Sequence, residues 1–318
     1  MPDHPKSWGA KGSDFGTSES APITPLALGL YLVSTPIGNL GDITLRALDV
    51  LRRVDRIACE DTRQTQKLLN HFAISKPAVS CHEHNERECA AKIVEALKTG
   101  ERIALVSDAG TPAISDPGAW LVREAIAAGV PVIPIPGANA AISALVASGL
   151  PASEFQFLGF LPEKAGARRT HLEKLAAEPC ESSRTLIFYE APHRILDTLA
   201  DLESAWGPAL RVVVARELTK IHEELVRGSV AEVRHELAAR DRMRGEITLL
   251  VEAPAISAHT SGVPVVEGSP EKIANRVARI QTTFNVDEKE ALKRLARELG
   301  RSKSELYREL QRERSLKR

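Results

Sequence analysis

The chain has 318 residues, and its 42 Lys and Arg residues balance 42 Asp and Glu residues, so the formal net charge is zero. This balance excludes a uniformly basic nucleic-acid coat protein, and four scattered cysteines exclude a disulfide framework. The charge is nevertheless uneven. Residues 270–318 hold 14 basic and 8 acidic residues, a local charge of +6, on a body that carries −6.

The beginning of the chain does not match a membrane anchor or a secretory signal. Residues 1–25 are rich in Pro, Gly and Ser, which predicts a disordered leader. The longest uncharged run, residues 20–41, contains three prolines and three glycines, so it lacks the roughly 18 continuous apolar residues of a membrane-spanning helix. No clear small-residue cleavage site precedes this run. We therefore expect a cytoplasmic protein without a membrane segment.

Residues 26–150 predict an α/β domain. Short apolar runs, typical of buried strands, alternate with stretches in which apolar residues recur at helical spacing. The strands are expected at 26–35, 56–60, 102–108 and 130–137. The helices are expected at 44–54, 62–72, 88–100, 118–129 and 138–149. Strands that alternate with helices favour a mostly parallel, open sheet.

A second unit is expected after residue 150. Five strand-like runs and three helical patterns in residues 151–253 predict another α/β domain with a mixed sheet. Residues 254–269 are predicted to be a linker, and residues 270–318 predict short helices with helix-turn-helix-like spacing. The basic charge of this last module fits either a solvated helical surface or an RNA-docking element.

Three loops that follow strands carry residues suited to ligand binding, at 34–42, 106–118 and 135–139. Ligands of open α/β folds bind beyond the carboxyl ends of the strands, so three such loops indicate one shared crevice. The first loop matches neither the GxGxxG pattern of dinucleotide sites nor the GxxxxGK[ST] pattern of nucleoside triphosphate sites. The second loop is more specific, and its Asp108 can bind an ammonium or hydroxyl group.

The charged residues Glu60, Asp61 and Arg63 allow two interpretations. They follow a predicted strand, where they can cap the next helix and interact with its dipole. Alternatively they are catalytic and lie at the mouth of the crevice, with Arg63 holding a phosphate and a carboxylate bonding an attacking hydroxyl. The sequence alone does not identify the general base.

The residues Cys81, His82, Glu83 and His84 have borderline spacing for a zinc site, with Cys89 downstream. A structural zinc site needs four ligands, and the sequence offers no second Cys-x-x-Cys pair. We therefore predict that the protein holds no metal.

The loop motifs resemble the tetrapyrrole methylase superfamily of S-adenosylmethionine-dependent methyltransferases. The similarity is strongest to the branch of ribosomal RNA small subunit methyltransferases I. It is carried by LYLVSTPIGNLGD, CEDTR, HEHNE, VSDAGTPAISDPG, PGANA, GFLPEK, FYEAPHRI, ARELTKIHEE and RGE. These motifs occur in this order from Leu30 to about Val251, or about 70% of the chain.

The resemblance implies a fold and an activity. The fold is two α/β domains of tetrapyrrole-methylase type, with the cofactor S-adenosylmethionine in the cleft between them, usually in a homodimer. The activity is methylation of the ribose 2′-hydroxyl of a cytidine in the decoding region of 16S rRNA, with the small ribosomal subunit as partner. Two alternatives stay open: a tetrapyrrole or precorrin C-methyltransferase, and a non-catalytic RNA-binding assembly factor.

The resemblance also implies which residues form the cofactor site. They come from the three strand-end loops and from the second domain: Pro36, Asp108, Gly110, Thr111, Ile114, Pro136, Gly137, Ala138, Leu161, Glu190 and Gly245.

Basic residues of the second domain are candidates for RNA contacts. Lys164, Arg168 and Arg169 lie in a Gly-interrupted stretch, which is either an exposed linker or a mobile arm that contacts phosphates. His193, Arg194 and Lys220 follow other predicted strands and are expected to form a basic wall beside the cleft.

Overall fold

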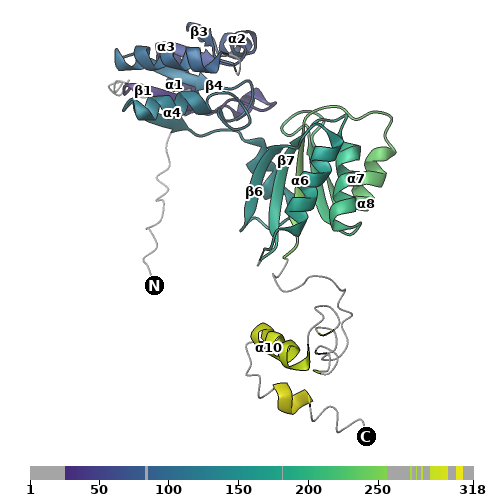
Figure 1. The fold of residues 1–318 in the computed structure, drawn as a ribbon. Coiled ribbons are helices and arrows are strands. Elements are labelled where there is room, and N and C mark those ends of the chain that lie inside the picture. The colour runs from purple at the N-terminus through teal and green to yellow at the C-terminus, as the bar shows by residue number, and fades with distance from the viewer. Residues whose placement is uncertain are drawn as a thin grey trace, which may run out of the picture.

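The computed structural model describes residues 26–82, 85–180, 182–255, 287–299 and 306–310, together with positions 273, 277 and 281. The predicted leader and nearly all of the predicted linker lie outside these residues. The described chain forms two α/β units, purple to teal and teal to green in Figure 1, and a C-terminal part that includes α10 (Glu288–Leu299). No helix in the described ranges is long and apolar enough to cross a membrane.

The first unit is built on a parallel sheet of five strands in the order β3-β2-β4-β1-β5. The strands are β1 (Gly29–Val33), β2 (Arg56–Cys59), β3 (Ala78–Ser80), β4 (Arg102–Val106) and β5 (Val132–Ile135). The helices are η1 (Leu40–Asp42), α1 (Leu45–Arg53), α2 (Thr62–His71), α3 (Glu86–Lys98), α4 (Ala119–Ala127) and α5 (Ala140–Ser148). The sequence does not predict β3, because three residues at a sheet edge give too short a pattern.

Alternation along the strands gives this sheet two buried faces. In β1, Leu30 packs into the cluster beneath α3 and α4, whereas its neighbour Tyr31 packs into the cluster beneath α1 and α2. Both faces are therefore covered by helices, as expected for a parallel sheet. The carboxyl ends of the strands stay accessible for ligands.

The second unit has a mixed sheet, as the sequence predicts, and its strand order is β6-β7-β10-β8-β9. Only β6 and β7 pair in parallel, and the other neighbours are antiparallel. The strands are β6 (Phe155–Phe160), β7 (Arg184–Glu190), β8 (Arg211–Arg216), β9 (Glu224–Ser229) and β10 (Ile247–Ala253). The helices are α6 (Ala165–Ala177), α7 (Ile195–Trp206) and α8 (Val230–Ala238), which cover one face (Figure 1).

Helix α5 joins the two units. Its side chains Ala141, Ala144 and Leu145 pack against the face of the second sheet opposite to α6, α7 and α8. Arg227 of β9 donates hydrogen bonds to the carbonyl oxygens of Ala147 (2.6 Å) and Ser148 at the end of α5, where a cation also interacts favourably with the helix dipole. The strand-end loop that leads into α5 is therefore held against the second unit.

The described C-terminal residues have a hydrophobic cluster of their own. Its buried members are Ile273, Val277, Ala291, Leu292, Leu295, Leu306 and Leu310. Helix α10 lies within the predicted helical stretch, and the division of the whole chain into domains at residues 150, 253 and 269 stays a proposal, including a helical module at 270–318.

Candidate functional site

The loops after β1, β4 and β5 lie side by side. Thr35 and Gly110 exchange two backbone hydrogen bonds, of 2.8 and 3.1 Å. The hydroxyl of Thr111 donates to the carbonyl oxygen of Ala138 and lies 3.1 Å from the hydroxyl of Ser34. The crevice predicted from three strand-end loops is therefore confirmed.

Glycine permits this close approach at two positions. A Cβ at Gly137 would lie 2.8 Å from the Cβ of Ser34, closer than packed carbon atoms allow. Gly110 has a φ of +83°, which favours glycine. Gly137 thus lets the loops after β1 and β5 pack together, and Gly110 turns its backbone toward the pocket described below.

The loop between β4 and α4 is held in an unusual conformation. Ala113 and Ser115 have φ values of +67° and +59°, which residues with side chains rarely adopt. The carboxylate of Glu86 on α3 accepts hydrogen bonds from the backbone N–H groups of Gly118 (2.8 Å) and Trp120 (3.1 Å). These bonds anchor the end of the loop, so the residues before it are fixed beside the crevice.

Both units line a pocket of about 320 Å³, which we call the central pocket. The first unit contributes its strand-end loops and the second contributes the ends of β6, β7, β8 and β10. The lining residues are Ile37, Ala109, Gly110, Thr111, Ile114, Ser115, Asp116, Asn139, Ala140, Phe160, Tyr189, Glu190, Ala191, Pro192, Ala215, Leu218, Gly245, Glu246, Ile247 and Thr248. A mostly apolar pocket of this size with a few polar groups is typical of small-molecule sites.

A hollow beside the central pocket shares Ile37, Ala109 and Glu246 with it. This strand-end hollow is lined by Thr35, Pro36, Ile37, Gly38, Leu40, Gln64, Thr65, Lys67, Leu68, Ser107, Asp108, Ala109 and Glu246. The two depressions are therefore neighbours, so a second reactant in the hollow would lie next to a ligand in the central pocket.

Lys220 of the second unit packs against the loop after β1. A Cβ at Gly38 would lie 2.5 Å from the Cγ of Lys220, so the aliphatic stem of this lysine lies directly on the Gly38 backbone. Its ammonium group donates to the carboxylates of Glu217 (2.9 Å) and Glu246 (3.0 Å). Lys220 is thus engaged in two ion pairs at the rim of the cleft.

Asp116 is the carboxyl group of the central pocket whose acidity is most altered. Its pKa is raised to about 6, mainly by burial and also by the charges of Glu60 and Asp108, while a hydrogen bond with Ser107 opposes this rise. A carboxyl group with such a pKa exchanges a proton near neutral pH. Sequence reasoning missed this residue, although its motif contains both aspartates of the loop.

The predicted cofactor residues fall into three groups. Those that line the central pocket are Gly110, Thr111, Ile114, Glu190 and Gly245. Pro36 and Asp108 line the strand-end hollow. Ala138 lines neither depression, but its carbonyl oxygen accepts a hydrogen bond from Thr111, which lines the central pocket. Pro136, Gly137 and Leu161 line neither depression. Sequence reasoning also missed Asn139, Phe160 and Thr248, which line the central pocket.

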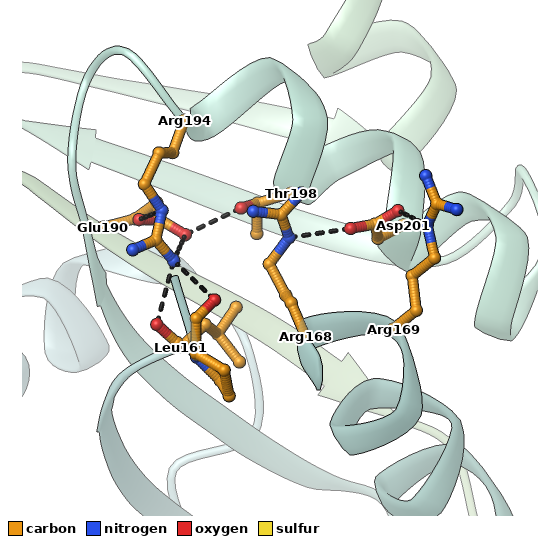
Figure 2. A network of polar contacts seen from close by, with 8 residues as sticks. Leu161, Arg168, Arg169, Glu190, Arg194, Thr198 and Asp201 are labelled. Carbon is orange, nitrogen blue, oxygen red and sulfur yellow. Dashed lines mark hydrogen bonds and ion pairs between the residues drawn. The ribbon is translucent and has the colours of Figure 1, made fainter. Parts of the chain in front are cut away.

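Glu190 is a supporting residue of the pocket wall. Its side chain is fully buried and forms an ion pair with Arg194 at 3.1 Å, and it also accepts a 2.7 Å hydrogen bond from Thr198 (Figure 2). Arg194 in turn donates to the carbonyl oxygens of Leu161 and Pro162 (Figure 2). This network joins the ends of β6 and β7, so Arg194 is occupied within the protein and only His193 beside it is exposed.

The predicted mobile arm is part of a helix. Lys164 is the exposed N-cap of α6, and Arg168 and Arg169 lie in its first turns. Arg168 is 3% exposed and donates to Asp201 at 2.7 Å, whereas the exposed Arg169 binds the other oxygen of the same carboxylate (Figure 2). The buried position of Arg168 corrects the expectation of a flexible phosphate-binding arm.

The predicted catalytic residues line neither depression, but they lie close to Asp108 of the strand-end hollow and Asp116 of the central pocket. Asp61 caps α2, since its carboxylate accepts the backbone N–H of Arg63 at 2.8 Å, and it also pairs with the guanidinium of Arg63. The backbone N–H of Asp61 donates to Asp108 at 3.2 Å. The capping interpretation is therefore confirmed, and the catalytic role of Glu60, Asp61 and Arg63 stays a prediction. Among the described residues no group of three metal-binding side chains occurs, and Glu83 and His84 lie outside them.

Comparisons with known proteins agree with this architecture. The family model described as Tetrapyrrole (Corrin/Porphyrin) Methylases matches residues 29–234. The chain is 47% identical to "Ribosomal RNA small subunit methyltransferase I" of Halalkalibacterium halodurans over 87% of this chain and 93% of that protein. It is 53% identical to the protein of the same name from Pasteurella multocida over 70% of this chain and 78% of that protein.

Solved structures show the same fold at low identity. A diphthine synthase matches with a TM-score of 0.52 at 16% identity, over 70% of this chain and 89% of that one. A cobalt precorrin-4 methyltransferase matches with a TM-score of 0.50 at 20% identity, over 70% and 93%. The chain therefore belongs to the tetrapyrrole methylase family of S-adenosylmethionine-dependent methyltransferases, in the branch of the ribosomal RNA small subunit methyltransferases I.

Proposed function

We propose that this protein transfers the methyl group of S-adenosylmethionine to the ribose 2′-hydroxyl of a cytidine in the decoding region of 16S rRNA. The RNA substrate is supported by the names of relatives that match along most of their own length. The methyl-transfer chemistry is supported by the central pocket, which is lined by the carboxyl group of Asp116 and lies next to the strand-end hollow.

The central pocket fits the cofactor. Gly110 and Gly245 line it with backbone alone, and Gly245 packs so tightly that a Cβ there would lie 2.4 Å from the Cγ of Glu217. In the proposal Gly110, Thr111 and Ile114 hold the cofactor from the first unit, and Ala191, Gly245 and Thr248 hold it from the second: these residues line the pocket. When bound, S-adenosylmethionine supplies an electrophilic methyl group, and the electron pair of the broken C–S bond stays on sulfur.

Asp116 is proposed as the acceptor of the hydroxyl proton. The ribose oxygen forms the new bond to the methyl carbon and must lose its proton, and a carboxylate beside the pocket can take it. The high pKa of Asp116 makes its carboxylate a stronger base than an ordinary one. Glu60 then acts electrostatically on Asp116, and Asp61 and Arg63 belong to the rim through which RNA enters.

The test is methyl transfer from radiolabelled cofactor into small ribosomal subunits that lack the modification, with the modified nucleotide mapped by mass spectrometry. We expect label in one 2′-O-methylcytidine, and no label in a tetrapyrrole offered in parallel. Label in the tetrapyrrole alone would replace this proposal with the C-methyltransferase. Cofactor binding without transfer to either acceptor would support the assembly factor.

We further propose a cytoplasmic homodimer. Ile142 and Val146, one turn apart on α5, are 44% and 75% exposed, and Phe155 is 46% exposed on β6, the edge strand of the second sheet. Exposed apolar side chains on a helix and on an edge strand suit burial against a second copy. Light scattering of the wild type and of a Val146→Lys variant tests this, because a dimer through this face should dissociate in the variant.

A further inference from the structure

A shallow groove of about 600 Å³ follows α2 at the edge of the first sheet. We call it the α2 groove. It is lined by Thr62, Arg63, Gln66, Lys67, Asn70, Lys76, Pro77 and Ala78, so one wall is α2 and the other is the chain that enters β3. The proton transfer and the methyl transfer proposed above use none of these residues, and only Arg63 is shared with the proposed RNA rim.

The lining of the α2 groove is basic and amide-rich, with no acidic residue in it. The ammonium group of Lys67 donates to the neutral amide oxygen of Gln64 at 2.9 Å, and α2 itself contains no Asp or Glu. Exposed lysines elsewhere in this unit are balanced, since Lys92 and Lys98 on α3 pair with carboxylates one turn away. Arg63 is paired with Asp61, so it is the positive charge of Lys67 and Lys76 that is left for an anionic partner.

The groove also adjoins the reaction site. Lys67 lines both the α2 groove and the strand-end hollow, and this hollow shares three residues with the central pocket. A chain that places one nucleotide in the hollow can therefore continue along α2. The spacing of cations and amides suits a single strand, whose phosphates bind Lys and Arg and whose sugars and bases bind amides.

We propose that the α2 groove binds the phosphodiester backbone of the single-stranded RNA next to the target nucleotide, through Lys67 and Lys76 in particular. This inference rests on the proposed ribosomal RNA substrate. It places the RNA contacts on the first unit, whereas four of the six basic residues predicted from the sequence are engaged in ion pairs of the second unit: Arg168, Arg169, Arg194 and Lys220.

The decisive experiment compares two double variants of the full chain. Lys67→Gln with Lys76→Gln removes two charges from the groove, and Lys92→Gln with Lys98→Gln removes two from α3 as a matched control. Binding to a small-subunit RNA fragment is measured against salt concentration, and cofactor affinity is measured by calorimetry. Two lost phosphate contacts should reduce the slope of log K against log[salt] by roughly 1.4, the value for single strands. The control should keep the wild-type slope, and both should bind cofactor normally.

A second measurement uses the wild-type chain and is independent of folding in the variants. Lysine acylation, read by mass spectrometry, should be suppressed by RNA at Lys67 and Lys76 but not at Lys92 and Lys98. Equal slopes in the two variants, or no protection of the groove lysines, would overturn the inference even if the wild type methylates ribosomal RNA. A wild type that methylates no RNA would instead refute the proposed function.

Discussion

Removing Asp201 should destabilise the second unit strongly, because the buried guanidinium of Arg168 then has no counter-charge. The side chains of Arg168 and Asp201 are only 4% and 5% exposed, and they meet at 2.7 Å between α6 and α7 (Figure 2). In an Asp201→Ala variant the guanidinium of Arg168 stays buried without its counter-charge. The perturbation therefore tests whether Arg168 is structural, as the structure places it, or free to contact RNA, as its sequence context suggests.

The size of the expected loss in unfolding free energy follows from the exposure of Arg168 and Arg169, the two partners of Asp201. Breaking a buried ion pair by removing one partner costs about 3–5 kcal/mol of unfolding free energy. The second partner, Arg169, is 64% exposed. Its contribution should be at most about 1 kcal/mol, because water screens the pair. We therefore expect about 3–5 kcal/mol for Asp201→Ala and no more than about 1 kcal/mol for Arg169→Ala.

Urea unfolding followed by the fluorescence of Trp206 measures this difference. Trp206 ends α7 and packs against the core of the second unit. Replacing Trp8 and Trp120 with Phe leaves it as the only tryptophan. Replacing both partners, Arg168→Met with Asp201→Leu, should recover most of the loss, since no unpaired buried charge remains and Arg169 is exposed to water. A loss below about 1 kcal/mol in Asp201→Ala would refute the reasoning, because that value is typical of exposed pairs.

Three further predictions concern the site and the C-terminal part. Gly245→Ala should weaken cofactor affinity about tenfold, because Gly245 has a φ of +90° and the side chain of Glu217 occupies the place of the new Cβ. The control Gly129→Ala also has a positive φ, +73°, but its Cβ meets open space, so cofactor affinity should stay unchanged. Calorimetric titration measures the cofactor affinity of both variants. Single-turnover methylation should rise with pH through about 6 as Asp116 loses its proton, and Asp116→Asn should abolish it while retaining cofactor affinity; a flat profile contradicts this. Truncation after Ala253 should leave folding and cofactor affinity intact, since the C-terminal apolar residues form their own cluster, but should weaken subunit binding at moderate salt; loss of folding contradicts this.

The shared crevice could be predicted from the sequence because it depends on local signals. Strands β1, β4 and β5 each show as an apolar run, and each ends in a loop that contains Gly and Pro residues. Parallel strands place such ends at one edge of the sheet, so the loops containing Ser34, Thr111 and Ala138 had to meet. Motif order then identified the family, which the comparisons confirm.

The roles of charged residues could not be predicted, because their partners are distant in sequence. Arg168 binds Asp201, which lies 33 positions away in the sequence, and the sequence around neither residue indicates that the pair is buried. Asp116 has the same limitation, since its pKa depends on burial and on Glu60, which comes from another strand end. A basic stretch in a sequence therefore indicates charge but not whether that charge faces water.

Strained backbone occurs on both walls of the central pocket, and this argues for a site that is organised before its ligands arrive. Ala113 and Ser115 flank the lining residue Ile114, and Glu217 and Thr219 flank the lining residue Leu218; all four have φ between +52° and +67°. Such residues cost about 1–3 kcal/mol each and persist only where surrounding bonds fix them. Here the Glu217 carboxylate accepts hydrogen bonds from Lys220 and from the backbone of Glu246. Because the folded chain already holds this conformation, binding need not order these loops, and the reacting groups start near their working positions.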